Sequence, residues 1–316
     1  MKLGFLTAPF PETPLMDVAD WAASEGFEVL EIACWPKSDG PTRRYAGTSH
    51  IDVANLSASQ AREIRSEIEA KGLSISGLGF YPNPLHPDPE HRATVIGHLK
   101  RVIDAAEMMD VELVNTFMGG DGALNQDQNW EEALRVWPEI VAYAQDHGRK
   151  ITLENCPMLF SLDEWPGGHN IATTPRMWRR ILEQWGGTIG LNFDPSHLVL
   201  QMIDTRRFLE EFGRHVLHYQ AKDLMIDRDG LYERGIFSMG MGWQIPRIPG
   251  LGEVDWGIVH GELYRAGYEG DCIIEHVWWR REARRTRSVE AASQSCPECY
   301  RCAAGCDRHR SRSQWQ

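Results

Sequence analysis

The sequence predicts an α/β fold, specifically a (β/α)8 TIM barrel, and three observations support this prediction. Apolar strand-like runs alternate with helical segments along most of the chain, and strict alternation at this spacing is typical of a parallel sheet. Eight such steps fit into 316 residues, which favours a sheet closed into a barrel with helices outside. No glycine-rich fingerprint follows the first strand, which disfavours the alternative of an open, doubly wound nucleotide-binding sheet.

Strands and helices are predicted to alternate regularly over the first half of the chain. Ser57 is a favourable N-cap for the second helix and Gly72 a favourable stop, because serine accepts from free amides and glycine tolerates left-handed backbone. Pro89 falls in the first turn of the third helix, where its missing amide hydrogen is harmless. Strands are expected over residues 3–8, 29–35, 74–80 and 113–119, and helices over residues 14–27, 57–72, 89–110 and 130–148.

The alternation continues through the second half up to a last strand. Strands are expected over residues 150–156, 189–197, 216–224 and 272–279, and helices over residues 174–186, 204–213 and 255–268. Two long connections, residues 80–88 and 225–255, follow the third and seventh strands, which places them at the carboxyl-terminal face of a barrel. The methionine, tryptophan and isoleucine content of the second connection indicates a lid or a partner contact.

The C-terminal segment changes character. Residues 277–316 are rich in arginine and lack the apolar periodicity of the expected eighth helix, so we expect a catalytic barrel over residues 1–276 and an atypical Arg- and Cys-rich tail with that helix missing or replaced. The tail has the C-x2-C-x2-C-x3-C spacing of an iron–sulfur or zinc site. It lacks a following proline and a second cysteine set, so we favour a reading-frame change near Val277. The cysteines concerned are Cys296, Cys299, Cys302 and Cys306.

Composition and charge narrow the functional classes. The formal net charge of -12 repels phosphates, which disfavours a general nucleic-acid surface. The apolar run at the N-terminus is too short for a signal peptide and no stretch approaches a membrane span, so we expect a cytoplasmic protein. The other three cysteines, Cys34, Cys156 and Cys272, fall in apolar strand-like segments, where a buried thiol is the usual state.

Polar side chains end each of the last four predicted strands. Because the carboxyl ends of barrel strands are neighbours, the carboxylates of Glu154, Asp194 and Glu275 are expected to converge. Converging carboxylates repel one another in a confined site unless a cation lies between them. An oxygen-rich set of ligands favours Mn²⁺ or Mg²⁺ over Zn²⁺. The polar residues at these strand ends are Glu154, Asp194, His197, His218, Gln220, Lys222, Glu275 and His276.

Each of these residues alone has an ordinary structural explanation. A glutamate at a strand end is often a helix cap, and Asp194 before a proline often caps a turn. A metal site is favoured because four consecutive strands carry polar groups at the same end. In the strand over residues 216–224, side-chain alternation places His218, Gln220 and Lys222 on one face, and we expect this face to point into the site.

At these residues the sequence resembles the sugar phosphate isomerase/epimerase superfamily, also called the xylose isomerase-like TIM barrels. The motifs that carry the resemblance are "ITLENC", "NFDPSHL", "HYQAKD" and "IIEH". The resemblance implies one divalent metal held by Glu154, Asp194, Gln220 and Glu275. Most members have a histidine where this chain has Gln220, but an amide oxygen can also bind a hard cation.

The resemblance also implies a reaction. A metal chelates the carbonyl and an adjacent hydroxyl of an open sugar and stabilises the enediolate, while Glu154 and Glu275 move the proton. This describes an isomerase or epimerase for a small polyol or keto-sugar. Phe160 stands where the ketose epimerase branch has a further glutamate, which weighs against a close ketose 3-epimerase. His197 is expected to contact substrate hydroxyls.

Other substrate contacts and other activities stay open. His218, Lys222 and Trp243 are further candidates for substrate binding, although Trp243 fits plain packing equally well. The segment "SMGMGWQIPRIPGLGEVDWG" is similar to subgroup members associated with cleavage of keto-glycosides and C-glycosides, which makes a lyase the main alternative. No phosphate-binding loop is evident, so an unphosphorylated substrate is expected.

Two further classes are less favoured. A multi-zinc nuclease of the related endonuclease type needs many histidines and a basic face, and both the net charge and Gln220 oppose it. An inactive partner subunit in a homo- or hetero-oligomer fits Gln220 and the unusual tail, but the three retained carboxylates oppose it.

Overall fold

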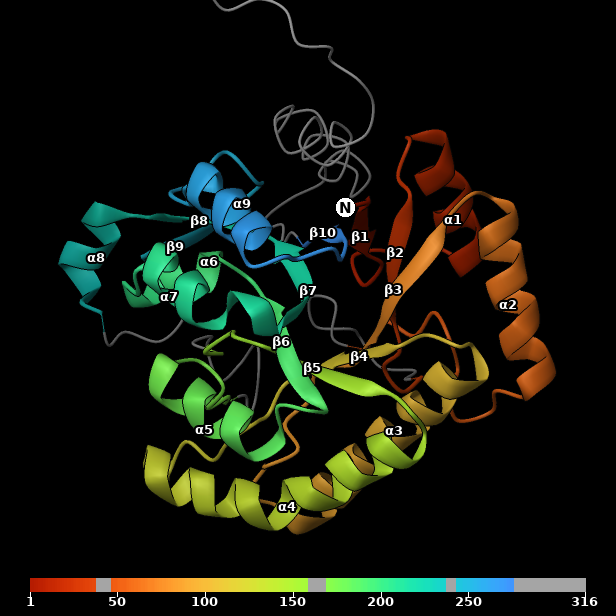
Figure 1. The fold of residues 1–316 in the computed structure, drawn as a ribbon, viewed down its shortest axis with the longest axis horizontal. Coiled ribbons are helices and arrows are strands. Elements are labelled where there is room, and N and C mark those ends of the chain that lie inside the picture. Colours follow the sequence, from red (N-terminus) through yellow and green to blue (C-terminus); the bar gives the residue numbers. More distant parts are fainter. Residues whose placement is uncertain (38–46, 159–168, 237–242, 276–316) are drawn as a thin grey trace, which may run out of the picture.

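The computed structural model describes residues 1–37, 47–158, 169–236 and 243–275 (Figure 1). Eight parallel strands close into a barrel in the order β1-β10-β7-β6-β5-β4-β3-β2, which confirms the predicted fold. The barrel strands are β1 Leu3–Leu6, β2 Val29–Ala33, β3 Ser74–Gly79, β4 Leu113–Thr116, β5 Lys150–Glu154, β6 Ile189–Phe193, β7 Val216–Ala221 and β10 Cys272–Ile274.

Helices between the strands form the outer layer of the barrel, as Figure 1 shows. Ser57 caps α2 through a reciprocal capping box with Gln60, as the sequence predicted for this helix start. Asn125 and Gln128 make the same box, which starts α4 before the residue 130 expected from periodicity. The helices are α1 Leu15–Ser24, α2 Ala58–Ala70, α3 Pro89–Met108, α4 Gln126–Asp146, α5 Pro175–Trp185, α6 Ser196–Gln201, α7 Thr205–Phe212, the 3-10 turn η1 Gly213–His215, α8 Arg228–Arg234 and α9 Trp256–Arg265.

Strand residues that face the helices form the main apolar core. Tyr219 of β7 stacks with Phe193 of β6 at a centroid distance of 6.1 Å, and both side chains are fully buried. Because Tyr219 packs in this outer core, the alternate residues His218 and Gln220 point into the barrel, as predicted. Elsewhere in the barrel, strands β1 and β2 approach so closely that a Cβ at Gly4 would lie 1.8 Å from the carbonyl oxygen of Val29.

The region after β7 differs from the sequence prediction. The expected strand over residues 216–224 ends at Ala221, and a second strand, β8 Asp223–Ile226, pairs antiparallel with β9 Gln244–Arg247. Helix α8 follows β8, so the expected long loop carries regular structure at the periphery of the barrel (Figure 1). The expected strand over residues 189–197 was also too long, because α6 begins at Ser196.

The C-terminal tail lies outside the described residues, with its four cysteines, so its separation from the barrel stays a prediction. In the ranges that the structure describes, no helix is long and apolar enough to cross a membrane. The three remaining cysteines, Cys34, Cys156 and Cys272, are buried free thiols, as expected.

Candidate active site

Three carboxylates meet where the carboxyl ends of neighbouring barrel strands converge. Glu154 ends β5, Asp194 follows β6 and Glu275 follows β10. One carboxylate oxygen from each residue lies within 4.8 Å of the others, and all three side chains are buried. The convergence follows from the parallel arrangement of the strands, which brings their last residues to the same rim of the barrel.

Lys222, directly after β7, lies among these carboxylates. Its Nζ is 2.6 Å from Oδ2 of Asp194, 3.0 Å from Oε2 of Glu275 and 3.7 Å from Oε1 of Glu154. Burial disfavours the charged form of Asp194, but the nearby His197 and Lys222 outweigh this effect and lower its pKa below the usual value. The ammonium therefore reduces the repulsion between the carboxylates.

His197 joins the same group from the first turn of α6. Its Nε2 lies 3.0 Å from Oε1 of Glu154 and 3.1 Å from Oδ2 of Asp194. Burial disfavours the charged imidazole, but the adjacent Asp194 outweighs this effect and raises the pKa of His197 well above its usual value. Three carboxylates against a protonated His197 and Lys222 leave one net negative charge, so the group still attracts a cation.

Two asparagines hold the backbone of the carboxylate residues, and neither was predicted from the sequence. Asn155 Nδ2 donates to the carbonyl of Asp194 at 2.9 Å, and its Oδ1 accepts from the Asp194 amide at 2.8 Å. Asn170 Nδ2 donates to the carbonyl of Glu154 at 2.9 Å and to that of Cys156 at 2.8 Å. Position 155 directly follows the predicted ligand Glu154, and this proximity was the available signal. Asn170 lies within the connection between β5 and α5, and no sequence pattern marked it.

The side chain of Gln220 is held by hydrogen bonds from its amide nitrogen. Its Nε2 donates to Oε2 of Glu31 and to the hydroxyl of Tyr81, both at 2.9 Å. Its Oε1 is buried and lacks a hydrogen-bond partner in the part of the chain that the structure describes. An orphaned carbonyl oxygen near the end of β7 is available for the fourth ligand position that the family resemblance implies.

His218 lies deeper in the barrel than Gln220. Its Nδ1 is 2.8 Å from Oδ1 of Asn192, and its Nε2 is 3.1 Å from Oγ of Ser76. Burial lowers the pKa of His218 to about 3, so the ring is neutral. Burial raises the pKa of Glu31 to about 7, partly offset by the hydrogen bond from Tyr81.

The structure therefore brings together most of the predicted site residues but not all. Glu154, Asp194, His197, Lys222 and Glu275 share direct contacts. Trp243 is 1% exposed and belongs to a separate small core, packed with residues of α6 and β8; the members of this core are Leu200, Leu224, Ile226 and Trp243.

The donor atoms present fit a divalent cation. The group Glu154, Asp194 and Glu275 offers three oxygens, and Gln220 Oε1 adds a neutral oxygen donor of the same hard type. A second group, Glu154, Cys156 and His197, has ligand atoms equally close together and offers softer donors. The two groups share Glu154, so they form parts of one centre rather than two independent sites.

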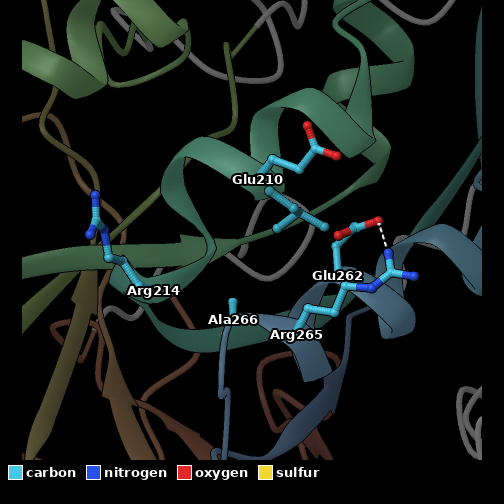
Figure 2. Close-up of a pocket in the computed structure, with 6 residues that line it drawn as sticks. Glu210, Arg214, Glu262, Arg265 and Ala266 are labelled. Carbon is cyan, nitrogen blue, oxygen red and sulfur yellow. Dashed lines mark hydrogen bonds and ion pairs between the residues drawn. The ribbon is translucent and has the colours of Figure 1, made fainter.

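A separate hollow lies between α7 and α9 on the outer helix layer (Figure 2). Glu262 is buried there and pairs with Arg265 at 2.5 Å and with Arg206. None of the carboxylates at the strand ends lines this hollow, so it is distinct from the candidate active site; the lining residues are Leu209, Glu210, Arg214, Glu262, Arg265 and Ala266.

A known protein family shares this barrel architecture. A family model described as xylose isomerase-like TIM barrel matches residues 19–295. The chain belongs to the xylose isomerase-like TIM barrel family. An uncharacterized protein of Bacillus subtilis (strain 168), YfiH, is 24% identical and covers 93% of this chain and 99% of its own length. The superfamily resemblance seen in the sequence motifs is thereby confirmed.

Two solved structures share the fold of this chain over almost its full length. D-psicose 3-epimerase with D-tagatose from Clostridium cellulolyticum H10 has a TM-score of 0.68 at 16% identity, covering 97% of this chain and 100% of that chain. The IolI protein with a binding zinc atom has a TM-score of 0.68 at 16% identity, covering 96% and 98%. At these identities the likeness shows the shared xylose isomerase-like fold alone.

Proposed function

We propose that this protein is a divalent-metal-dependent sugar isomerase or epimerase that moves a proton at a carbon next to a carbonyl group. The observation that carries the proposal is the convergence of three buried carboxylates with Lys222 and His197 at the carboxyl end of the barrel. The family supports a sugar-modifying enzyme, since D-psicose 3-epimerase has the same fold. The substrate class is a small polyol or keto-sugar.

The metal would be held by Glu154, Asp194, Gln220 and Glu275. When bound, a divalent cation would supply electrophilic activation of the carbonyl and an adjacent hydroxyl, which acidifies the hydrogen on the hydroxyl-bearing carbon. The oxygen donors favour Mn²⁺ or Mg²⁺, whereas Cys156 and His197 are softer donors that suit Zn²⁺. The IolI structure contains zinc, so all three metals belong in the test.

Glu154 and Glu275 are the proposed acid–base pair. Glu154 ends β5 and Glu275 follows β10, so the two carboxylates can approach a substrate carbon from different directions. One carboxylate oxygen takes the proton, and the same or the other carboxylate returns it. Return to the other face of the same carbon gives epimerisation, and return to the neighbouring carbon gives isomerisation. His197 Nε2, 3.0 Å from Glu154 Oε1, orients that carboxylate.

The proposed substrate contacts differ in how well the structure supports them. Lys222 and His197 lie within ion-pair distance of the carboxylates and are placed to bind a hydroxyl or a carbonyl oxygen there. His218 is 1% exposed and engaged with Asn192, so any substrate contact requires a change in that network. Trp243 is enclosed in its small core, and a contact with a sugar ring requires that core to open.

A second candidate function is elimination from a keto-glycoside. Its support is the segment around β9, "SMGMGWQIPRIPGLGEVDWG", which is similar to subgroup members associated with glycoside cleavage. The same proton removal next to a carbonyl would then break the bond to the aglycone on the neighbouring carbon, and the departing aglycone would take a proton from the acid form of Glu154 or Glu275. The two candidates therefore share Glu154 and Glu275 and differ in the fate of the substrate.

Hydrogen exchange with solvent tests the shared step. The protein loaded with Mn²⁺ is incubated in D₂O with ketoses and 3-keto-glycosides, and NMR measures deuterium at carbon together with aglycone release. Deuterium in recovered sugar supports the isomerase or epimerase, and aglycone release supports the lyase. If neither deuterium incorporation nor aglycone release occurs with Mn²⁺, Mg²⁺ or Zn²⁺, the proposal is contradicted. Glu139→Gln on the surface of α4 is a matched control that retains wild-type exchange.

A further inference from the structure

Gln220 makes two hydrogen bonds through the same atom. Its Nε2 donates to Glu31 Oε2 and to Tyr81 Oη, each at 2.9 Å. Glu31 comes from β2 and Tyr81 from the segment after β3, so both cross the barrel interior to reach β7. All three side chains are buried, with Gln220 and Glu31 fully inaccessible and Tyr81 4% exposed.

The chemistry of these two neighbours determines which end of the amide they accept. Both oxygens of the Glu31 carboxyl group act as acceptors in this arrangement, because Oε2 accepts from the amino group of Gln220 and Oε1 accepts from the hydroxyl of Tyr81. The hydroxyl hydrogen of Tyr81 is directed at Oε1 of Glu31, and Asn192 Nδ2 donates to the same hydroxyl at 3.0 Å. Tyr81 is therefore also an acceptor toward Gln220, and a flipped amide would place a carbonyl oxygen against two acceptors.

The opposite end of the amide is left unpaired. Oε1 of Gln220 is buried, and no hydrogen-bond donor reaches it from the described ranges. A buried carbonyl oxygen without a donor is unfavourable because it has lost its hydrogen bonds to water. Coordination to a cation would satisfy this atom, and the neighbouring carboxylates already attract a cation to that end of β7.

We propose that Glu31 and Tyr81 are positioning residues that fix the Gln220 amide with its carbonyl oxygen toward the divalent cation. The inference rests on the proposed metal-dependent function. Neither residue binds the metal; both act through Gln220, by making one of its two amide orientations strongly preferred. The pair thereby lets an amide act as a preorganised ligand, since reorientation on metal binding is not needed.

Tyr81→Phe tests the proposal because it removes the hydroxyl and retains the ring. Manganese affinity is measured from free Mn²⁺ by electron paramagnetic resonance, and stability without metal is measured by urea unfolding in EDTA. We expect Tyr81→Phe to weaken Mn²⁺ binding roughly 10- to 100-fold, the usual effect of losing a residue that orients a ligand. Glu31→Gln, whose amide can present either end to Gln220, is expected to change the affinity in the same direction.

Two further variants distinguish a positioning role of Tyr81 from a general loss of stability. Ser76→Ala removes a hydroxyl that contacts His218 rather than Gln220, and it should leave Mn²⁺ affinity within about twofold of wild type. In a Gln220→Met background, which has no amide to orient, Tyr81→Phe should have no further effect on Mn²⁺ affinity. A residue with a merely structural role would lower stability equally in both backgrounds and leave the affinity unchanged.

The outcomes distinguish this inference from the proposed function. Wild-type affinity in Tyr81→Phe, with Mn²⁺ still bound at the carboxylates, overturns the positioning role and leaves the proposed function standing. An equal loss of affinity on adding Tyr81→Phe to Gln220→Met also overturns it, because the effect then does not pass through Gln220. If the wild-type protein binds none of Mn²⁺, Mg²⁺ and Zn²⁺, the metal-dependent function and this inference both fail.

Discussion

The ammonium nitrogen of Lys222 lies 2.6 Å from Oδ2 of Asp194, at the meeting point of the three carboxylates. A divalent cation held by the same oxygens would bring two positive charges close to this ammonium. Metal and lysine therefore oppose each other electrostatically, and Lys222 must withdraw when the cation binds. Its long side chain allows such a movement, which would place the ammonium nearer to the substrate.

Replacement of Lys222 by methionine should affect the metal-free and metal-bound protein in opposite ways. The metal-free protein loses the ion pairs of Lys222 with buried carboxylates, so we expect a loss of about 3–5 kcal/mol in its unfolding free energy. Affinity for Mn²⁺ should rise because the competing charge is gone. Urea unfolding in EDTA and Mn²⁺ titration measure the two effects.

Lys150→Met is the matched control for this experiment. Its partner is Glu112, at 2.8 Å on the surface, and both side chains are well exposed. Exposed pairs contribute roughly 0–1 kcal/mol, so this variant should behave as wild type in both measurements. A Lys222→Met protein that binds Mn²⁺ more weakly than wild type would contradict the competition between lysine and metal.

The metal-free protein should also lose stability as pH rises because of Glu31. Burial raises the pKa of Glu31 from 4.5 to about 7, so between these values the folded chain binds a proton that the unfolded chain has released. The contribution is present below pH 4.5 and is lost as pH rises to 7. The shift corresponds to a loss on the order of 3 kcal/mol.

Glu31→Gln isolates this contribution because glutamine does not titrate. Unfolding free energies of the variant and of wild type in EDTA are compared at several pH values from 4.5 to 8. The difference between them should change by the predicted amount over this range, with wild type losing stability relative to the variant as pH rises. A constant difference would show that Glu31 titrates normally in the fold.

Asp223 should determine the conformation of the connection between β9 and α9. Its carboxylate accepts from the amides of Leu224, Gly250, Gly252 and Val254 at 2.8 to 3.0 Å and from the Trp256 indole at 3.1 Å. Asp223→Asn replaces one acceptor oxygen by a donor that faces amide hydrogens. We expect a loss of roughly 1–3 kcal/mol in unfolding free energy, measured in urea, and faster proteolysis of residues 243–256.

The exposed Asp229→Asn in α8 is the corresponding control, and its stability should match that of wild type. Unchanged proteolysis in Asp223→Asn would show that the connection is held by its apolar contacts instead.

Cys156 tests which donor group is the main metal site. Its sulfur lies close to ligand atoms of Glu154 and His197 but outside the all-oxygen group. If Mn²⁺ binds through oxygens, Cys156→Ala should leave Mn²⁺ affinity within roughly threefold of wild type, as measured by titration. A much larger loss would move the site toward the softer donors. Cys272→Ala, at a buried thiol of β10 itself, controls for cavity effects.

The sequence predicted the barrel and the carboxylates because both depend on local patterns. Alternating apolar runs mark the strands, and Glu154, Asp194 and Glu275 each follow directly from a strand end. Parallel strands bring such ends together whatever the detailed packing. Element boundaries were less predictable. Helix α6 begins inside the expected strand over residues 189–197, and β8 begins inside the expected strand over residues 216–224, because short polar stretches do not show where a strand ends.

Glu31 and Tyr81 could not be predicted as parts of the site. Glu31 is the single charge in the apolar strand β2, and Tyr81 lies in a connection rich in proline. Their contact with Gln220 depends on closure of the barrel, which brings β2 and β3 across from β7. Sequence spacing has no information on such a contact, because the residues are far apart in the chain and belong to different strand–helix units.

The measurement that tests the central claim most directly is the metal content of purified wild-type protein and of Glu154→Gln by elemental analysis. The account predicts a stoichiometric amount of Mn²⁺, Mg²⁺ or Zn²⁺ in wild type and its loss in Glu154→Gln, with Glu139→Gln retaining the metal. Equal metal in wild type and Glu154→Gln, or no metal in wild type after loading, would contradict it. Iron with sulfide, unaffected by Glu154→Gln, would instead assign the metal to the C-terminal cysteines.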